Sequence, residues 1–425
     1  MKRNFINRRI LISLIIGLVF TSSCEKDKIY PTDRETTSEF YDLMNQWYYW
    51  KDSIPVVDLD NYSSPEALLE GMRFLPKDKW SYITTEESFS QYYDEGTYVG
   101  YGFGYASDGD GNARITFLFD DSDLNDYGIA RGWIIREING TVIIDPTSVS
   151  GLLGVDEVGN TNTIKLESPT GEIVTQDFTK KIVSMNTVLS EMIIDVGTKK
   201  VGYFMFKSFI GPSEAELDNV LTYFKTEQID ELVIDLRYNG GGQMDIVSHL
   251  ASLIIPDDAD GEVFVTYEHN NDRSDQNQTT NFDQNPLSLR LNKIYFIAGH
   301  ASASASEAII NCLDPYMDVY VVGDDTYGKP VGMYAFGSTI SDLVYVPISF
   351  KLVNADGFGG YYGGLAADSY VEDDVLHNFG KGEAVLDEVL YHIENGTFSS
   401  LKSSTEIYRS PKVEIRNFKD EIGAI

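Results

Sequence analysis

Apolar residues of this chain gather in short runs, each flanked by glycine or polar residues. The runs at 232–236, 293–299 and 318–323 have the length and apolar content typical of buried strands. Between the last two, apolar residues at 308–313 recur at helical spacing. This pattern predicts a strand–helix–strand unit, which returns the chain to the same edge of a sheet. Ser304 lies where the predicted loop meets the helix.

The N-terminal part of the chain has helical periodicity. Apolar residues at 40–50 recur three or four positions apart, and Thr37 and Ser38 are the candidate N-terminal caps. A second helix is predicted with Ser64 as its N-cap and Pro65 in its first turn. The aromatic run QWYYW within the first segment is predicted to be core of a small helical domain rather than a ligand site.

Other patterns predict the remaining elements. Residues 342–358 alternate as paired strands, and 257–286 carry little apolar periodicity, which favours a long surface excursion. The run DGDGN at 108–112 lacks the glycine and glutamate that a calcium loop needs, so we expect a hairpin turn. Further predictions are a strand at 201–206, a hairpin at 161–178, and helices at 213–226, from Met244 onward, and at 383–393.

Two stretches carry candidate chemistry. Three consecutive glycines, 240–242, follow the strand at 232–236, and glycines let backbone N–H groups approach a ligand closely, as an oxyanion or a phosphate requires. Ser304 by itself is most simply a helix cap, but Lys329 follows 25 positions later, after a Gly-bounded turn. A lysine can accept the proton of a serine only when it is buried enough to be neutral.

Together these motifs identify a resemblance. DLRYNGGG, followed downstream by SASASE and then YGK, resembles the C-terminal processing peptidases, the tail-specific serine proteases. The resemblance implies that Ser304 is the nucleophile and Lys329 the general base, with Glu307 positioning the site. It also implies that the backbone N–H groups of Ala305 and Gly241 bind the oxyanion. The expected function is a serine endopeptidase that works through an acyl-enzyme and engages unstructured C-terminal tails.

One position departs from this family. Many members carry a glutamine four residues after the lysine to orient it, and this chain has Met333 there. The alternative is therefore a catalytically impaired, peptide-binding or scaffolding lipoprotein. A Ser/His site using His300 is disfavoured, because neither motif leaves a place for a carboxylate behind it. An acyl hydrolase of the serine β-lactamase type would need lysine where Glu307 stands.

The resemblance also implies the fold, an α+β multidomain protein. It comprises an N-terminal helical domain, a PDZ-like β domain and an α/β protease core of the ClpP/crotonase type. In the PDZ-like domain, Gly102, Phe103 and Gly104 occupy the place of the loop that binds a peptide carboxylate. The expected bounds are 35–95 for the helical domain, 96–182 for the PDZ-like domain, 183–400 for the core and 401–425 for a C-terminal tail.

The first residues form an export signal. Residues 1–23 combine a positively charged start, a short apolar core and small residues before Cys24. This resembles a bacterial lipoprotein signal, in which Cys24 is lipidated, although Thr21 stands in place of the usual leucine; ordinary secretion is the alternative. Residues 24–34 read as a tether. The expected location is the bacterial cell envelope, with the protein anchored in a membrane.

The charge, histidine and cysteine content of the chain limits which partners and cofactors are expected. With 33 basic and 66 acidic residues the net charge is −33, which argues against nucleic acid as a partner. The five histidines are scattered without ligand spacing, so neither a metal nor another cofactor is expected. With Cys24 lipidated, Cys312 has no partner for a disulfide and is predicted to pack in the core. The expected partners are protein or peptide substrates and, through the lipid, a membrane.

Overall fold

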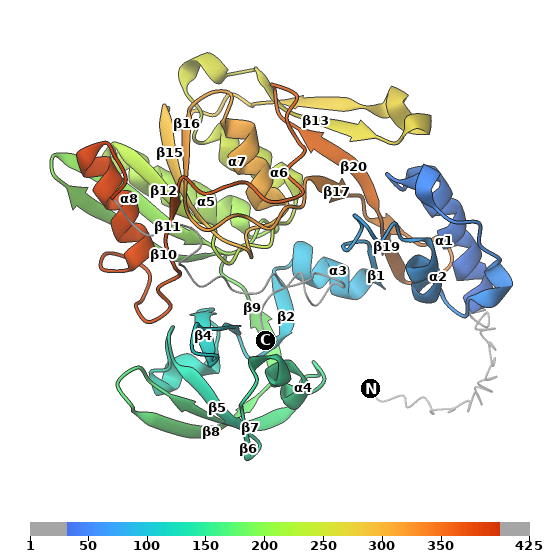
Figure 1. Ribbon diagram of the computed structural model, residues 1–425, viewed down its shortest axis with the longest axis horizontal. Coiled ribbons are helices and arrows are strands. Elements are labelled where there is room, and N and C mark those ends of the chain that lie inside the picture. The colour runs from blue at the N-terminus through green and yellow to red at the C-terminus, as the bar shows by residue number, and fades with distance from the viewer. Residues whose placement is uncertain (1–31, 400–425) are drawn as a thin grey trace, which may run out of the picture.

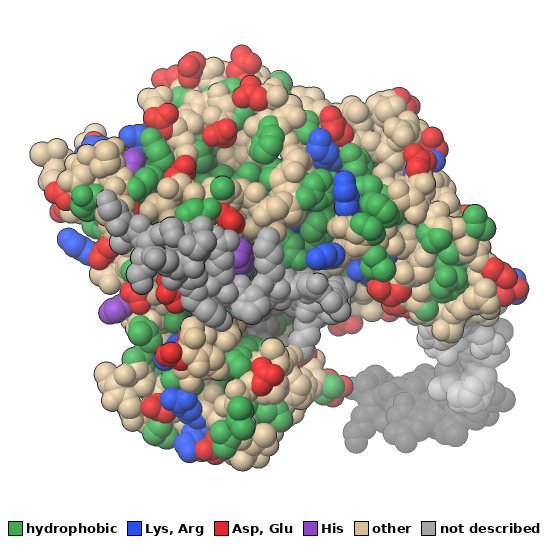
Figure 2. Space-filling model, in the orientation of Figure 1, with side chains coloured by type: hydrophobic (Ala, Val, Ile, Leu, Met, Phe, Trp, Pro, Cys, Tyr) green, Lys and Arg blue, Asp and Glu red, His purple; other side chains and the backbone are tan. Residues whose placement is uncertain are grey.

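The computed structural model describes residues 32–399 (Figure 1). The predicted signal segment, the lipidation at Cys24, most of the tether and the C-terminal tail lie outside these residues. Within 32–399, no helix is long and apolar enough to cross a membrane. Acidic side chains are spread over the face in Figure 2 rather than gathered in one patch, as expected for a surface that uses charge for solvation.

The N-terminal helices are α1 (Asp33–Trp47) and α2 (Pro65–Met72). The second begins as predicted, with the Ser64 side chain accepting a hydrogen bond from a backbone N–H. The predicted caps of the first, Thr37 and Ser38, are wrong. Its N-cap is Thr32, which forms a capping box with Glu35, and a reciprocal pair of this kind fixes a helix start more firmly than a single hydroxyl.

The N-terminal helices do not form a separate hydrophobic core. Their apolar faces pack against residues from much later in the chain, among them Tyr345, Ile348 and Ala303. Strands from both ends of the chain also pair here. In this three-stranded sheet the order is β1 (Tyr82–Thr85), β19 (Leu343–Val346), β18 (Phe336–Gly337). The N-terminal part is thereby fastened to the part that carries Ser304.

A separate β domain lies at the bottom of Figure 1. Its sheet buries a core of its own, which includes Phe103, Ile115, Ile135 and Ile164. The predicted turn at 108–112 and the predicted hairpin at 161–178 are both confirmed. Its elements are β3 (Phe103–Ser107), β4 (Ala113–Leu118), β5 (Ile134–Ile138), β6 (Thr141–Val142), α4 (Val149–Leu153), β7 (Thr161–Glu167) and β8 (Ile173–Thr179). The connections to the rest of the chain are α3 (Glu86–Tyr93), β2 (Thr97–Gly100) and β9 (Lys181–Ser184), with β2 and β9 paired.

The central sheet has six strands, and those from β11 onward run parallel. Alternate residues of β11 face opposite sides, so Phe204 packs against helices α5, α6 and α7 while Tyr203 packs beneath α8 (Figure 1). The strand order is β10 (Val188–Val196), β11 (Lys199–Phe206), β12 (Glu231–Asp235), β15 (Lys293–Ala298), β16 (Asp318–Gly323), β21 (Ser369–Tyr370). The helices are α5 (Ser213–Glu227), α6 (Met244–Ser252), α7 (Ala305–Leu313) and α8 (Ala384–Asn395). The strands and helices predicted in this region are confirmed.

Two predictions for the C-terminal half are wrong. The segment 257–286 is a hairpin rather than a surface excursion, and Phe264 and Val265 on its first strand are buried in the main core. The strands within 342–358 do not pair with each other, because Pro347 separates them and each joins a different sheet. The second of these sheets has the order β14 (Gln278–Asn281), β13 (Val263–His269), β20 (Ile348–Val353), β17 (Val331–Met333).

Candidate active site

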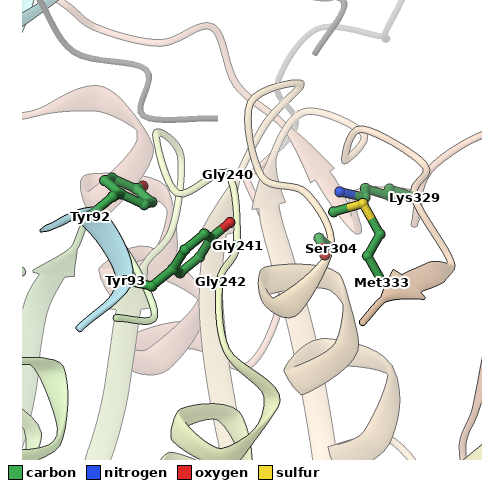
Figure 3. Close-up of a pocket in the computed structure, with 8 residues that line it drawn as sticks. All are labelled: Tyr92, Tyr93, Gly240, Gly241, Gly242, Ser304, Lys329 and Met333. Carbon is green, nitrogen blue, oxygen red and sulfur yellow. The ribbon is translucent and has the colours of Figure 1, made fainter. Parts of the chain in front are cut away.

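Three loops meet at one edge of the central sheet. They follow the neighbouring parallel strands β12, β15 and β16, and they carry Gly240–Gly242, Ser304 and Lys329 respectively. The carboxyl ends of parallel strands meet at the same edge, which is where open α/β sheets hold their ligands. All of these residues line one small pocket, shown in Figure 3, as the strand–helix–strand pattern predicts.

Ser304 has an unusual backbone conformation. Its φ of 56° and ψ of −111° lie in a region that side chains other than glycine rarely adopt, at a cost of about 1–3 kcal/mol. The residues on either side, Ala303 and Ala305, are fully buried, whereas Ser304 is partly exposed. The Ala303 N–H donates to the Asn239 carbonyl at 3.1 Å, which ties this turn to the glycine loop. The strain therefore presents the Ser304 hydroxyl to the pocket.

Glu307 connects the serine to the lysine. Its carboxylate is completely buried, and one oxygen, Oε2, accepts the backbone N–H of Ser304 at 3.0 Å and that of Lys329 at 2.8 Å. The other oxygen, Oε1, accepts the Thr326 hydroxyl and the Gly328 N–H, both at 2.6 Å. Burial raises the pKa of the Glu307 carboxyl, and these four hydrogen bonds oppose the rise. One side chain thus fixes the backbone at both candidate catalytic residues.

The turn before Lys329 requires glycine. Gly328 has a φ of +95°, and a Cβ there would lie 2.5 Å from the carbonyl oxygen of Tyr362. The turn delivers Lys329 to the pocket with only 2% of its surface exposed. The Lys329 Nζ lies 6.0 Å from the ring centroid of Trp80, and Met333 lies beside the lysine in Figure 3. The lysine is therefore enclosed by large apolar side chains.

The two candidate oxyanion donors differ in their hydrogen bonds. Ala305 is the first residue of α7, where a backbone N–H has no acceptor within the helix. The Gly241 N–H donates to the Asn239 side chain at 2.9 Å. Gly241 has a φ of +112°, and a Cβ there would lie 2.8 Å from the Cβ of Ser304. The glycine loop is thus packed directly against the serine.

Other residues at the pocket have no signal in the sequence. Tyr92 and Tyr93, at the end of α3, face the glycine loop from the side opposite Lys329 (Figure 3). Tyr92 is held by a hydrogen bond of 3.2 Å to the hydroxyl of Ser208, and the Tyr93 carbonyl accepts the N–H of Gly211 at 2.7 Å. The cavity between these walls has a volume of about 30 Å³, room for roughly one water molecule.

The remaining candidates lie apart from this pocket. His300 Nδ1 lies 2.9 Å from the carbonyl oxygen of Asp325, and its Nε2 is 3.5 Å from the Asp324 carboxylate, so both ring nitrogens contact the loop that follows β16. Cys312 is fully buried in the main core, as predicted, and burial raises the pKa of its thiol. Across residues 32–399, no three side chains of the metal-binding types lie together in a way that could hold an ion.

The Gly102–Gly104 segment belongs to the β domain. Gly102 has a φ of +85°, and its N–H hydrogen bonds to the Tyr98 side chain. Phe103 is buried in the core of the domain, and Gly104 packs against the ring of Phe117. Phe103 and Gly104 are the first two residues of β3, which is an edge strand of its sheet. The predicted role of the segment in binding a peptide carboxylate stays a prediction.

Comparison with known families agrees with this arrangement. Residues 200–356 match the model of Peptidase family S41, and residues 36–82 match the model of the Peptidase S41 N-terminal domain. These two stretches of the chain are therefore domains of the S41 peptidase type, and the resemblance to the C-terminal processing peptidases is confirmed.

Curated relatives carry names of the same kind. The chain is 26% identical over 291 residues to carboxyl-terminal-processing peptidase 1, chloroplastic, of Arabidopsis thaliana, which covers 67% of this chain and 58% of that protein. It is 27% identical over 334 residues to a "Probable CtpA-like serine protease" of Staphylococcus aureus (strain N315), with coverage of 77% and 60%. The chain thus spans less than two thirds of the length of these relatives.

Solved structures share the fold. A "Putative S41 protease" from Bacteroides fragilis superimposes with a TM-score of 0.69 at 24% identity, covering 84% of this chain and 97% of that one. The photosystem II D1 C-terminal processing protease gives a TM-score of 0.53 at 16% identity, with coverage of 80% and 94%. The mixed α/β fold with N-terminal helices is thereby confirmed.

Proposed function

We propose that this chain is a serine endopeptidase in which Ser304 and Lys329 form the catalytic dyad. The observation that carries the proposal is the Glu307 carboxylate, since a single oxygen accepts the backbone N–H groups of both residues. The strained backbone of Ser304 supports the same reading, because strain of this kind gathers at functional sites. The names of the relatives are those of serine proteases and processing peptidases.

The reaction uses each group in turn. The Ser304 oxygen attacks the carbonyl carbon of the scissile peptide bond while its proton passes to the Lys329 amine. The negative charge on the substrate oxygen is held by backbone N–H groups of Ala305 and the glycine loop. Collapse of this intermediate breaks the C–N bond, and the leaving amine takes the proton from Lys329. Water, deprotonated by the same lysine, then hydrolyses the acyl-enzyme.

The Gly241 N–H must first break an existing hydrogen bond before it can bind the oxyanion. Its N–H donates to the Asn239 side chain, so it becomes an oxyanion donor only when this hydrogen bond is released. The Asn239 side chain is itself anchored, because its amide nitrogen donates to the Phe206 carbonyl at 3.0 Å. Substrate binding is therefore expected to rearrange the glycine loop, and Ala305 is the donor that is ready without movement.

The wider roles of the chain are part of the same proposal. The substrates are exported proteins or peptides with unstructured C-terminal tails, which the domain at 96–182 receives as a PDZ-like module near Gly102–Gly104. The region 183–400 acts as a ClpP/crotonase-type protease core behind the helical domain at 35–95. Lipidation at Cys24 would hold the enzyme in the cell envelope. The order of the motifs along the sequence supports these assignments.

A second candidate is a peptide-binding lipoprotein with an impaired protease core. One observation favours it, because the Met333 thioether at the pocket is only a weak acceptor for the lysine. This candidate predicts peptide binding without turnover.

The two candidates separate in one experiment. Purified residues 25–425 are incubated with an unstructured reporter protein, beside Ser304→Ala and Lys329→Ala variants whose folding is checked by circular dichroism. The peptidase proposal predicts cleavage by the wild-type chain and none by either folded variant. Peptide binding without cleavage by the wild type would favour the scaffold, and cleavage by the folded Ser304→Ala variant would refute the dyad.

A further inference from the structure

Trp80 lies against the lysine of the proposed dyad, although it comes from the N-terminal part of the chain. Its ring centroid is 6.0 Å from the Lys329 Nζ, near the limit of a cation–π contact. The two side chains are 4% and 2% exposed, so little solvent reaches the space between them. The inference that follows rests on the proposed function, because it concerns how this lysine handles a proton.

The position of Trp80 is set by a buried carboxylate. Asp78 is completely buried, and its Oδ1 accepts the backbone N–H groups of Trp80 and Ser81, both at 3.0 Å. Its Oδ2 accepts the hydroxyls of Ser81 at 2.7 Å and Tyr48 at 2.8 Å. The Trp80 ring also packs edge-on against Tyr327, at 6.3 Å between centroids. The ring is therefore held rigidly beside the turn that carries Lys329.

The ring face, rather than the indole N–H, is the useful part of Trp80. The Trp80 Nε1 is buried and donates no hydrogen bond to any residue in 32–399. Such a donor is costly to bury, by about 1–3 kcal/mol, so the position is not explained by stability through hydrogen bonding. An aromatic ring face, in contrast, attracts a cation electrostatically. It carries no strong hydrogen-bond acceptor that would hold water molecules next to a neutral amine.

This arrangement suits a proton acceptor. Before reaction the lysine must be neutral, and a large aromatic wall keeps water away from it. When Lys329 takes the Ser304 proton it becomes an ammonium, and the electron-rich ring face then stabilises the charge that has just formed. Met333, on the pocket side of the lysine, supplies only a weak thioether acceptor. We propose that Trp80 is a positioning residue for Lys329 that supports its charged form during acyl transfer.

The proposal predicts a specific kinetic effect. Cation–π contacts of this kind are worth a ~2- to ~30-fold change in rate. Trp80→Leu should lower kcat by this factor with little change in KM, because the ring acts on the proton transfer and not on substrate binding. The pH at which kcat/KM is half its maximum should also move. Trp80→Phe keeps a ring face and loses no hydrogen bond, so it should retain most of the activity.

Two further variants separate this role from a structural one. Trp50→Leu removes an aromatic residue from the same N-terminal core, where Trp50 packs against Tyr48 and Phe74 instead of the lysine, and it should leave the pH profile unchanged. Met333→Gln in the Trp80→Leu protein places an amide oxygen beside the lysine. Partial recovery of kcat in this double variant is expected, since an amide oxygen can hold an ammonium.

A readout independent of cleavage completes the test. In a Ser304→Ala background, the rate of reductive methylation at Lys329 is measured by mass spectrometry for the Trp80→Leu, Trp80→Phe and Trp50→Leu proteins. Faster labelling of Lys329 in Trp80→Leu alone supports the positioning role even where no protein is cleaved. Equal labelling in the Trp80→Leu and Trp50→Leu proteins overturns it, whatever the activity. If the wild-type protein cleaves nothing but Lys329 is still labelled faster in Trp80→Leu alone, the proposed peptidase function is wrong. The contact between Trp80 and Lys329 would then still be supported.

Discussion

Replacement of Glu307 by glutamine tests how the site is held together. The carboxylate accepts four hydrogen bonds, two on each oxygen. Glutamine has nearly the same shape, but one of its terminal groups is an NH₂ that cannot accept from an N–H. Whichever way the amide turns, at least one backbone N–H, that of Gly328 or those of Ser304 and Lys329, faces a donor.

The size of the effect follows from these contacts. A hydrogen bond to a charged group contributes about 1.5–3 kcal/mol to the free energy of unfolding. Glu307→Gln loses at least one such bond and weakens the others. This loss should be larger than the stability gained by removing the desolvation cost of a buried charge. We expect Glu307→Gln to lower the free energy of unfolding by about 2–4 kcal/mol. It should also reduce kcat by about 100-fold or more, because the strained Ser304 backbone loses its anchor.

A matched variant makes the assay decisive. Glu388, on α8, is also buried, and its carboxylate accepts hydrogen bonds from the Ser369 hydroxyl and from the backbone N–H and hydroxyl of Ser399. None of these residues lines the pocket at Ser304. Urea unfolding and reporter cleavage are measured for both Glu→Gln proteins. Glu388→Gln should lose stability and keep kcat. A Glu307→Gln protein that retains wild-type kcat, or loses no more of it than Glu388→Gln, would show that the Glu307 carboxylate does not hold the catalytic residues in place.

Three other predictions concern the loop, the buried lysine and the domain contact. Gly241→Ala should reduce labelling of Ser304 by a serine-reactive phosphonate at least 100-fold, since its Cβ would lie 2.8 Å from that of Ser304; undiminished labelling would contradict this. Burial lowers the pKa of Lys207 to about 8, so the unfolded chain binds more protons above that pH, and stability should rise between about pH 8 and 10. This rise should shrink in Lys207→Met, and an unchanged slope in urea unfolding would be evidence against it. Arg131 of the β domain donates to the Tyr238 hydroxyl at 2.5 Å and to Asp373 at 2.7 Å, so Arg131→Met should give the β domain a separate, earlier calorimetric transition rather than a single shared one.

Local patterns in the sequence were sufficient for many elements. The strands at β12, β15 and β16 are short apolar runs bounded by glycine or polar residues, and α7 has a clear apolar periodicity. Parallel connection of these strands is enough to bring the glycine loop, Ser304 and Lys329 to one edge. The sequence alone was therefore sufficient to predict that the glycine loop lies close to Ser304 and Lys329.

The errors arise where distant parts of the chain meet. The hairpin at β13 and β14 looks polar because β14 and the segment before it consist mainly of polar, exposed residues, and the pairing of β13 with β20 has no local signal. Trp80 reaches Lys329, and Tyr93 reaches the pocket, through packing between segments that are distant in the chain, which periodicity does not describe. The strained backbone conformation of Ser304 could not be predicted either, because serine as a residue type gives no indication of it.

The most direct test of the central claim is the rate at which a serine-reactive fluorophosphonate modifies the protein, read by intact mass and peptide mapping. The Ser304–Lys329 dyad predicts a single adduct at Ser304 in the wild-type chain, formed at a rate that falls about 100-fold or more in a folded Lys329→Ala variant. Modification at another residue, or an equal rate without the lysine, would contradict the Ser304–Lys329 dyad.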